Sequence, residues 1–289
     1  MNYTVLLGEV NEEGINKELL PDIKIFLETA LVYLSKIFKK SLKVPPTYQK
    51  EEFQGVFTDA VAAYLYYRQL KMLLFPLIIR VGLGEGKHYP NPVDSEAIEG
   101  PAHYHAERSL ALATAYDIGC AYLSFSKSDK YLNSLLQALD FMEKKQSISV
   151  NLVKLFSEMY FPLYKKNAME FTEFQKDKDL IKALHYKEQF YYLLLETNPS
   201  LRGTEPAADN FYLPKLDECK IVDLETLYAK EKADIISCFW ERGFCTKIAK
   251  SMNNTTRQNV NKHLENGIIF QRNLEGSVAL FLAEKKNTL

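Results

Sequence analysis

The sequence predicts an α+β fold made of a sheet-containing N-terminal domain and a helical C-terminal part. Residues 77–86 are the first reason, because the β-branched run that follows Pro76 is typical of a buried strand. Three alternate glycines, ending with Gly86, let the backbone turn or approach another group closely. Short apolar runs alternate with segments of helical periodicity before Lys127, and amphipathic helices dominate after it.

The N-terminal elements are expected in the order strand, helix, hairpin, helix and strand. A glycine ends the first strand and leaves Glu9 at its carboxyl end, Pro21 is well placed to begin the first helix, and Thr58 or Asp59 can cap the second. This order resembles the split βαβ arrangement of ferredoxin-like and palm domains. The expected elements are a strand at 3–8, a helix at 21–40, a strand at 53–57, a helix from 58 or 59 to 74 and the strand at 77–86.

A further helix is expected from Gly100-Pro101 to residue 116, and its inner face carries mostly alanines that permit close packing on a sheet. A strand at 121–126 would complete the first domain, residues 1–127. Because a close approach is expected at the glycine end of the 77–86 strand, a cofactor could contact the chain there. The candidate cofactor-binding residues are Gly82, Gly84 and Glu85.

Residues 128–217 are expected to form a helical region and a linker. Their amphipathic segments predict helices at 132–145, 152–164 and 180–196, and three prolines favour a linker at 200–217. A final domain would occupy residues 218–289.

The spacing of apolar residues in 233–267 predicts a helix-turn-helix, with its third helix starting near Thr256 and ending at Gly267. Residues 268–270 and 278–281 are expected to be the two strands of a wing, joined by a turn at Gly276. Val260 and Leu264 would hold the third helix down and leave polar side chains facing outward. Duplex DNA binding is favoured over a small module for packing or dimerisation. The candidate DNA-binding residues are Arg257, Gln258, Asn259, Asn261, Lys262, Lys247 and Lys250.

Charge supports a nucleic-acid-binding C-terminal part. The formal net charge is −1, but residues 230–289 carry about +4 and the rest about −5. No signal peptide or membrane-length apolar run is present, so a cytoplasmic protein without membrane contact is expected. The 4 cysteines show no CxxC pair, which favours free thiols over disulfides or zinc.

The chain resembles the SatD family of bacterial proteins over roughly its first 125 residues, by motifs that occur in the same order. Together the motifs also look like a distant relative of the class III nucleotide cyclase catalytic domain. They are Leu7-Gly8-Glu9-Val10, Glu51-Glu52-Phe53-Gln54-Gly55, Arg80-Val81-Gly82-Leu83-Gly84-Glu85 and Gly100-Pro101-Ala102-His103-Tyr104-His105-Ala106-Glu107-Arg108.

The cyclase resemblance implies that Glu9 and Glu51 stand where two aspartates of that family hold two metal ions. Lys50 stands where the family has glycine, and its ammonium could take the place of a metal, which suits a lost activity. The resemblance also implies that Arg108 keeps the position of a phosphate-stabilising arginine, whereas Tyr104 replaces an asparagine.

The sequence therefore indicates two alternative functions. The first is a DNA-binding regulator, expected to be a homodimer without a cofactor, whose palm-like domain senses a nucleotide or phosphate ligand or serves dimerisation. The alternative is a divergent nucleotidyl-transfer or cyclase enzyme that needs Mg²⁺ or Mn²⁺ on Glu9 and Glu51 and uses Arg108. Two simpler readings stay open: Glu51-Glu52 as a solvated charged hairpin, and Arg80 as an ion-pair partner of Glu99 or Glu107.

Overall fold

A computed structural model describes the chain at residues 2–13, 15–49, 51–87, 89–90, 98–144, 146–197, 211–229, 241–253 and 255–287. No helix of this part of the chain is long and apolar enough to cross a membrane.

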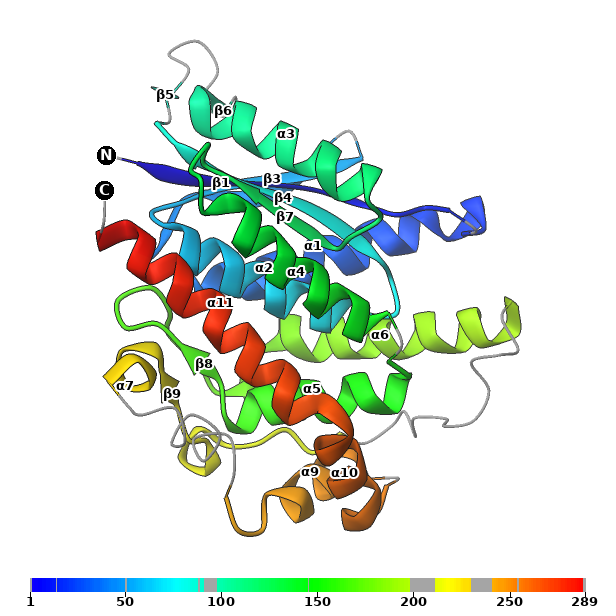
Figure 1. The fold of residues 1–289 in the computed structure, drawn as a ribbon. Helices are drawn as coiled ribbons and strands as arrows, with labels where there is room; N and C mark the ends of the chain where they lie inside the picture. The colour runs from blue at the N-terminus through cyan, green and yellow to red at the C-terminus, as the bar shows by residue number, and fades with distance from the viewer. Residues whose placement is uncertain are drawn as a thin grey trace.

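A five-stranded sheet with the order β2-β3-β1-β4-β7 organises the N-terminal half (Figure 1). All neighbouring pairs are antiparallel except β4 and β7, which are parallel. The order of the first four strands is that of ferredoxin-like and palm domains, which confirms the predicted topology. The strands are β1 (Tyr3–Val10), β2 (Leu42–Gln49), β3 (Glu52–Phe57), β4 (Ile79–Gly86) and β7 (Cys120–Leu123).

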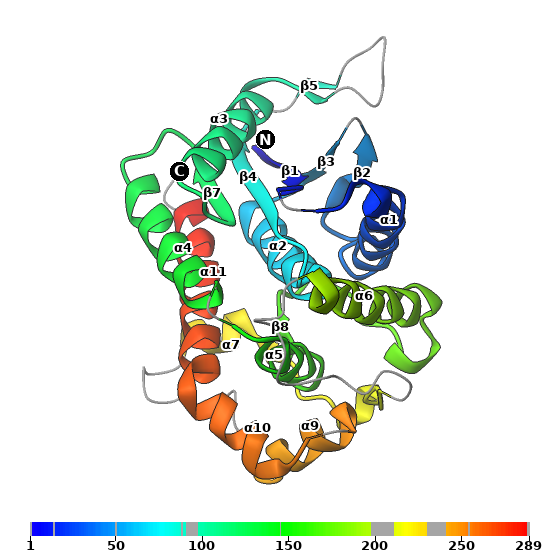
Figure 2. The same cartoon turned by 90° about the vertical axis from the view of Figure 1, so that its right-hand side faces the viewer.

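Helices cover both faces of the sheet (Figures 1 and 2). The helices α1 (Leu20–Ile37) and α2 (Ala60–Leu74) lie on one face, and α3 (Pro101–Ala115) lies on the other. Alternation along the strands produces this division: Val5 and Leu7 belong to the core under α3, whereas Leu6 belongs to the core shared with α1 and α2.

The glycines of β4 bring α3 onto the sheet. A Cβ built on Gly82 would lie 2.2 Å from the carbonyl oxygen of Ala106, and one built on Gly84 would lie 2.1 Å from the amide nitrogen of the same residue. The strand continues through Gly86 without a turn. The close approach expected from these glycines is therefore made by a helix of the chain itself, which fills the space that a cofactor would need above Gly82 and Gly84.

The C-terminal half is built almost entirely of helices. Those predicted at 132–145, 152–164 and 180–196 are present, with starts two to four residues earlier than predicted and ends within four residues of the predicted ones. They are α4 (Asp129–Glu143), α5 (Ile148–Tyr160) and α6 (Lys178–Thr197), followed by α7 (Leu224–Ala229), α9 (Phe244–Met252), α10 (Arg257–His263) and α11 (Ile269–Asn287). Short strands are β5 (Tyr89–Pro90), β6 (Ile98–Glu99), β8 (Leu163–Tyr164) and β9 (Val222–Asp223). Short 3-10 helices lie at Lys17–Leu19, Phe174–Lys176 and Leu216–Glu218, and Leu264–Ile268 is a π-helical turn.

The predicted wing is wrong. Apart from Ile268, which lies in the π-helical turn, its two strands and the turn between them belong to the single helix α11. This helix buries Gln271, Glu275, Val278 and Leu282 at helical spacing. Gly267 does interrupt the helix as expected, because its φ of 141° makes a kink between α10 and α11. The first helix predicted for the helix-turn-helix falls on residues 233–240, which lie outside the described residues.

The C-terminal helices form a second layer over α1 and α2. One hydrophobic core extends from Leu6 in β1 to Leu282 in α11, and it includes buried residues from all three of the predicted domains. Figure 1 shows α11 running from α10 at the bottom of the view up to the level of the sheet. The face of α1 and α2 that points away from the sheet is thus buried by the rest of the same chain.

Candidate functional site

The end of the sheet that carries Glu9 is occupied by protein partners. Glu9 accepts a hydrogen bond of 3.0 Å from the hydroxyl of Thr114 on α3, and its carboxylate lies 3.8 Å from the guanidinium of Arg80 on β4. Glu9 is paired with Glu52 of β3 in the strand register, so Glu52 rather than Glu51 shares its face of the sheet. Glu51 is exposed in the hairpin turn with a φ of 72°, and Lys50 lies outside the described residues.

Arg80 is an ion-pair residue, but its partners are not the glutamates that the sequence suggested. It donates a 2.9 Å hydrogen bond to Asp117, which also receives one of 2.8 Å from Lys144. These hydrogen bonds, first from Lys144 and then from Arg80, hold the pKa of Asp117 below its ordinary value. Glu107 instead lies 3.7 Å from His103 on the same helix.

This palm edge, defined by Glu9, Arg80, Thr114, Asp117 and Lys144, is a poor match to a divalent cation. The guanidinium of Arg80 already neutralises Glu9, and a second cation beside it would meet like-charge repulsion. Within the described ranges, no group of three or more His, Cys, Asp or Glu side chains is placed to hold a metal ion.

The two residues that the cyclase comparison selects on α3 lie on its solvent side. The residues of α3 that face the sheet include Ala102, Ala106 and Ser109, so Arg108 is exposed and Tyr104 is 52% exposed. The ring of Tyr104 stacks on Phe125 with centroids 6.5 Å apart. Among the described residues, no hydrogen bond or ion pair is seen for Arg108. It lies more than one helical turn before Thr114, the palm-edge residue on α3.

Glu85 has a partner within the fold. Its carboxylate accepts a hydrogen bond from the hydroxyl of Tyr122 on β7, and its backbone carbonyl lies 2.6 Å from Nδ1 of His105. Burial, together with this carboxylate, raises the pKa of Tyr122 above its ordinary value. Glu85 therefore ties β4 to β7 and α3.

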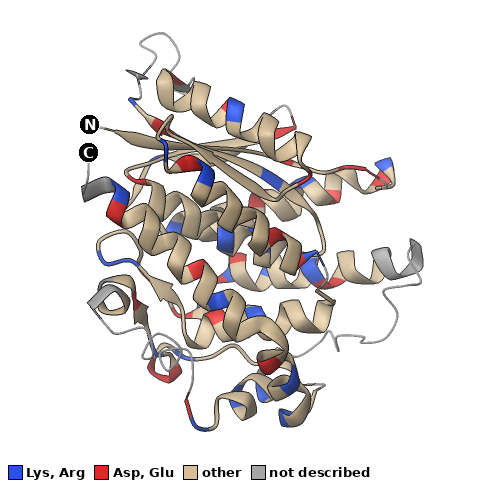
Figure 3. Ribbon diagram, viewed as in Figure 1, with Lys and Arg blue, Asp and Glu red and all other residues tan. Residues whose placement is uncertain are grey.

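The predicted polar surface lies on the α9–α10 unit, which consists of α9, α10 and the four residues between them. Thr256 caps α10 by accepting a 3.2 Å hydrogen bond from the amide of Asn259, and Val260 and Leu264 are buried beneath the helix. Figure 3 shows basic residues on α9 and α10 at the end of the molecule away from the sheet. The exposed residues of α10 are Arg257, Gln258, Asn259 and Lys262.

The other three candidate DNA-binding residues already have contacts. The amide of Asn261 donates a 2.8 Å hydrogen bond to Glu265, and the residue is only partly exposed. On α9, Lys247 lies 3.7 Å from Glu241, and the ammonium of Lys250 lies 4.4 Å from the ring centre of Tyr212. Lys250 is exposed and Lys247 is partly exposed.

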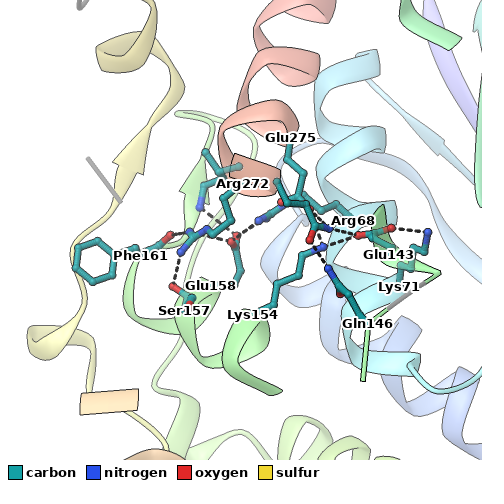
Figure 4. Close-up of polar contacts among 12 residues, drawn as sticks. Arg68, Lys71, Glu143, Gln146, Lys154, Ser157, Glu158, Phe161, Arg272 and Glu275 are labelled. Atoms are coloured by element: carbon teal, nitrogen blue, oxygen red, sulfur yellow. Dashed lines mark hydrogen bonds and ion pairs between the residues drawn. The ribbon is translucent and has the colours of Figure 1, made fainter. Parts of the chain in front are cut away.

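A cluster of buried ion pairs that the sequence reading missed lies between α2, α4, α5 and α11 (Figure 4). Its centre is Arg68 of α2, which forms ion pairs with Glu158 of α5 at 2.7 Å and with Glu275 of α11. All three side chains are 6% exposed or less. We call the ion network the set Arg68, Lys71, Asp140, Glu143, Lys154, Glu158, Arg272 and Glu275.

The other members extend this centre in both directions. Arg272 lies 3.2 Å from Glu158 and donates to the backbone carbonyls of Ser157 and Phe161. Lys154 bridges Glu275, at 2.6 Å, and Glu143. Lys71 then pairs with Glu143 at 2.5 Å and Asp140 at 2.9 Å.

Two carboxylates of the network, Glu143 and Glu275, have a lowered pKa because cations surround them. Burial alone would raise the pKa of Glu143, but the charges of Lys154 and Lys71 outweigh it and hold the value at about 2. Burial likewise opposes the charge of Glu275, and Arg68 and Lys154 lower its pKa below the ordinary value. A cavity of about 20 Å³ beside Arg68 and Cys120 is large enough for a water molecule and too small for an organic ligand.

A signal for this cluster is present in the sequence. The segment of α5 reads ISVNLVKLFSEMY, in which Lys154 and Glu158 stand four residues apart and are the only charged residues. Charged residues at the spacing of a buried face indicate partners elsewhere in the fold.

Comparisons with known proteins add little. No family model and no curated protein matches the chain. Among solved structures, the chain is similar to a bacterial light-regulated adenylyl cyclase, with a TM-score of 0.33 and 14% identity over 45% of this chain and 79% of that chain. At this TM-score the likeness carries no argument, and the palm-like topology rests on the strand order.

Proposed function

We propose that this chain binds duplex DNA through α10 and that its palm-like domain acts as a regulatory or dimerising module. The observation that carries the proposal is a helix anchored by Val260 and Leu264 whose exposed side is almost wholly polar and carries no exposed acidic residue between Arg257 and His263. Such a surface offers cations for phosphate oxygens and amides for base edges.

The exposed side chains divide into two chemical roles. The amides of Gln258 and Asn259 can each make paired hydrogen bonds to adenine in the major groove. Arg257 and Lys262 place a cation near each end of the helix, where they would contact phosphates. Lys247 and Lys250 on α9 would add phosphate contacts, whereas Asn261 is engaged with Glu265 and would act mainly by supporting the helix.

Selection from genomic fragments, followed by salt titration of the enriched duplex, tests the proposal. Replacing Lys262 by Ala should weaken binding to all sequences and lower the salt slope by about 1. Gln258→Ala should relax sequence preference with little change in slope. The matched control is Lys24→Ala, an exposed lysine of α1 that should leave binding unchanged.

Two results would contradict DNA binding through α10. One is that no duplex is enriched or retarded at low salt, and the other is that Lys24→Ala and Lys262→Ala weaken binding equally. Either result would move the α9–α10 unit to the protein-interaction class.

The strand order favours a second candidate, a divergent nucleotidyl-transfer enzyme using Glu9, Glu51 and Arg108. We place it second because Arg80 and Thr114 already contact Glu9. Incubation with ATP or GTP and Mg²⁺ or Mn²⁺ should give no product, and calorimetric titration with Mn²⁺ should show weak binding at most. Two tight Mn²⁺ sites or a cyclic nucleotide product would instead establish the enzyme.

A further inference from the structure

The ion network joins α2 of the palm-like domain to α11, which follows α10 after a short turn. We propose that the network fixes the register of α11 against α2 and thereby positions α10 for DNA. This inference rests on the function proposed above. In it, Arg68, Arg272 and Glu275 are positioning residues, because they are buried away from the surface that would meet DNA.

Stability alone does not account for these charges. Apolar side chains of similar volume in place of a buried ion pair often leave a protein equally stable or make it more stable. The surroundings here would suit such a replacement, since Leu136 and Leu139 of the main hydrophobic core line the same small cavity as Arg68 and Glu275. Unlike apolar contacts, buried ion pairs are satisfied in only one alignment of the helices that carry them.

The partners on α11 make that requirement strict. Arg272 reaches Glu158 and two carbonyls of α5 and its end, whereas Glu275, one turn later, reaches Arg68 and Lys154. Sliding α11 by one turn would move each charge by about 5.4 Å and leave it buried without its partner. Apolar side chains would tolerate the same shift at much lower cost.

The alignment of α11 is transmitted to α10 through a short connection. Five residues, Leu264–Ile268, separate the helices, and both end residues are buried. Arg272 lies in the first turn of α11 and Glu275 in the second. The network therefore acts on the part of α11 nearest to the DNA-binding helix.

The experiment removes ion pairs without leaving an unbalanced charge. The variant Arg68→Met/Glu275→Leu keeps three cations and three anions in the network, so it should unfold in urea near the wild-type midpoint. If that variant does not fold, Glu158→Gln/Arg272→Met carries the same test, because the glutamine side-chain oxygen can still accept the hydrogen bond that Glu158 receives from the amide of Leu163.

The matched control removes a pair of the same network that does not contact α11. In Lys71→Met/Asp140→Asn, the asparagine oxygen can still accept the 2.9 Å hydrogen bond from the amide of Gly119. Its affinity for DNA should equal that of the wild type.

Two readouts are measured on folded variants. The first is affinity for the selected duplex, which should fall about tenfold in the α11 pair variants, as it would if one molecule in ten held α10 in the binding position. The second needs no DNA: the distribution of distances between nitroxide labels at Lys24 and Lys262, attached through a ketone-bearing amino acid. It should broaden in the α11 pair variants and stay narrow in the control.

The two readouts separate failure of this inference from failure of DNA binding. Wild-type affinity together with a wild-type distance distribution in a folded α11 pair variant overturns the positioning role and leaves DNA binding standing. If the wild type retards no duplex, DNA binding fails, and the distance distribution decides alone. Broadening confined to the α11 pair variants then supports the positioning role, and an unchanged distribution overturns it.

Discussion

The palm edge and the ion network contain the same kinds of residue in opposite surroundings. At the palm edge the side chains of Glu9 and Asp117 are 31% and 66% exposed, so water and salt screen their ion pairs with Arg80. In the network Arg68 and Glu275 are 3% and 2% exposed, and each charge depends on its partners for the stabilisation that water would otherwise give. Burial, rather than the kind of charged residue, therefore decides whether an ion pair can rearrange at low cost or holds its helices in one arrangement.

The largest effect is expected from breaking the network at one side only. Glu275→Leu leaves Arg68 and Lys154 buried without this partner and should lower the free energy of unfolding by about 3–5 kcal/mol. Denaturation in urea measures the loss. A loss below about 1 kcal/mol would mean that water reaches these cations and that the two regions are electrostatically alike.

A smaller effect is expected where backbone packing, and not charge, holds the palm together. Gly84→Ala places a methyl group against the backbone of Ala102 and Ala106 and should cost about 1–3 kcal/mol by pushing α3 from the sheet. Gly276→Ala within α11 is the control, since a Cβ built there lies 3.9 Å from its nearest neighbour, Leu227 of α7, and it should stabilise by about 0.5–1 kcal/mol. Equal losses in both variants would contradict the tight packing of α3.

The loss of folding stability at acid pH tests the buried charges of the network against an exposed carboxylate. The pKa of Glu143 is lowered from 4.5 to about 2, so its contribution is complete above pH 4.5 and is lost as the pH falls toward 2. In Glu143→Gln/Lys154→Met this loss should disappear, which makes the acid slope shallower by up to about 1.4 kcal/mol per pH unit. The exposed Glu28→Gln is the control and should leave the slope unchanged.

The smallest effect is expected at the palm edge itself. Glu9→Gln should change the free energy of unfolding by about 0–1 kcal/mol, because its contact with Arg80 is partly exposed and 3.8 Å long. Urea denaturation at low and high salt measures it, and any loss should shrink at high salt. A large loss that is independent of salt would place Glu9 with the buried charges.

Much of the architecture could be predicted because it follows from local patterns. The β-branched run and glycines of 77–86 specified a strand with a close approach, although not that a helix would make it, and the order of elements before it specified the palm-like topology. On α10, the cap at Thr256 and the buried Val260 and Leu264 followed from the sequence for the same reason. The roles of the candidate site residues stay predictions.

Other features needed the tertiary structure. The runs at 268–270 and 278–281 are short and apolar, a pattern that suits a strand or a buried helix, and packing of α11 against α2 and α4 decided for the helix. The partner of Glu9 on β3 depended on the register between β1 and β3, which a shift of one residue would change.

By itself, the sequence determined the segments with a regular period, because hydrophobic spacing acts over a few residues. It placed Arg68 on a helix but Glu275 beside the turn of a wing, and because the two residues stand 207 positions apart, no local pattern relates them. Only the packing of α2, α5 and α11 decided that these charges would meet in the core, because an ion pair depends on distance in space and on the exclusion of water.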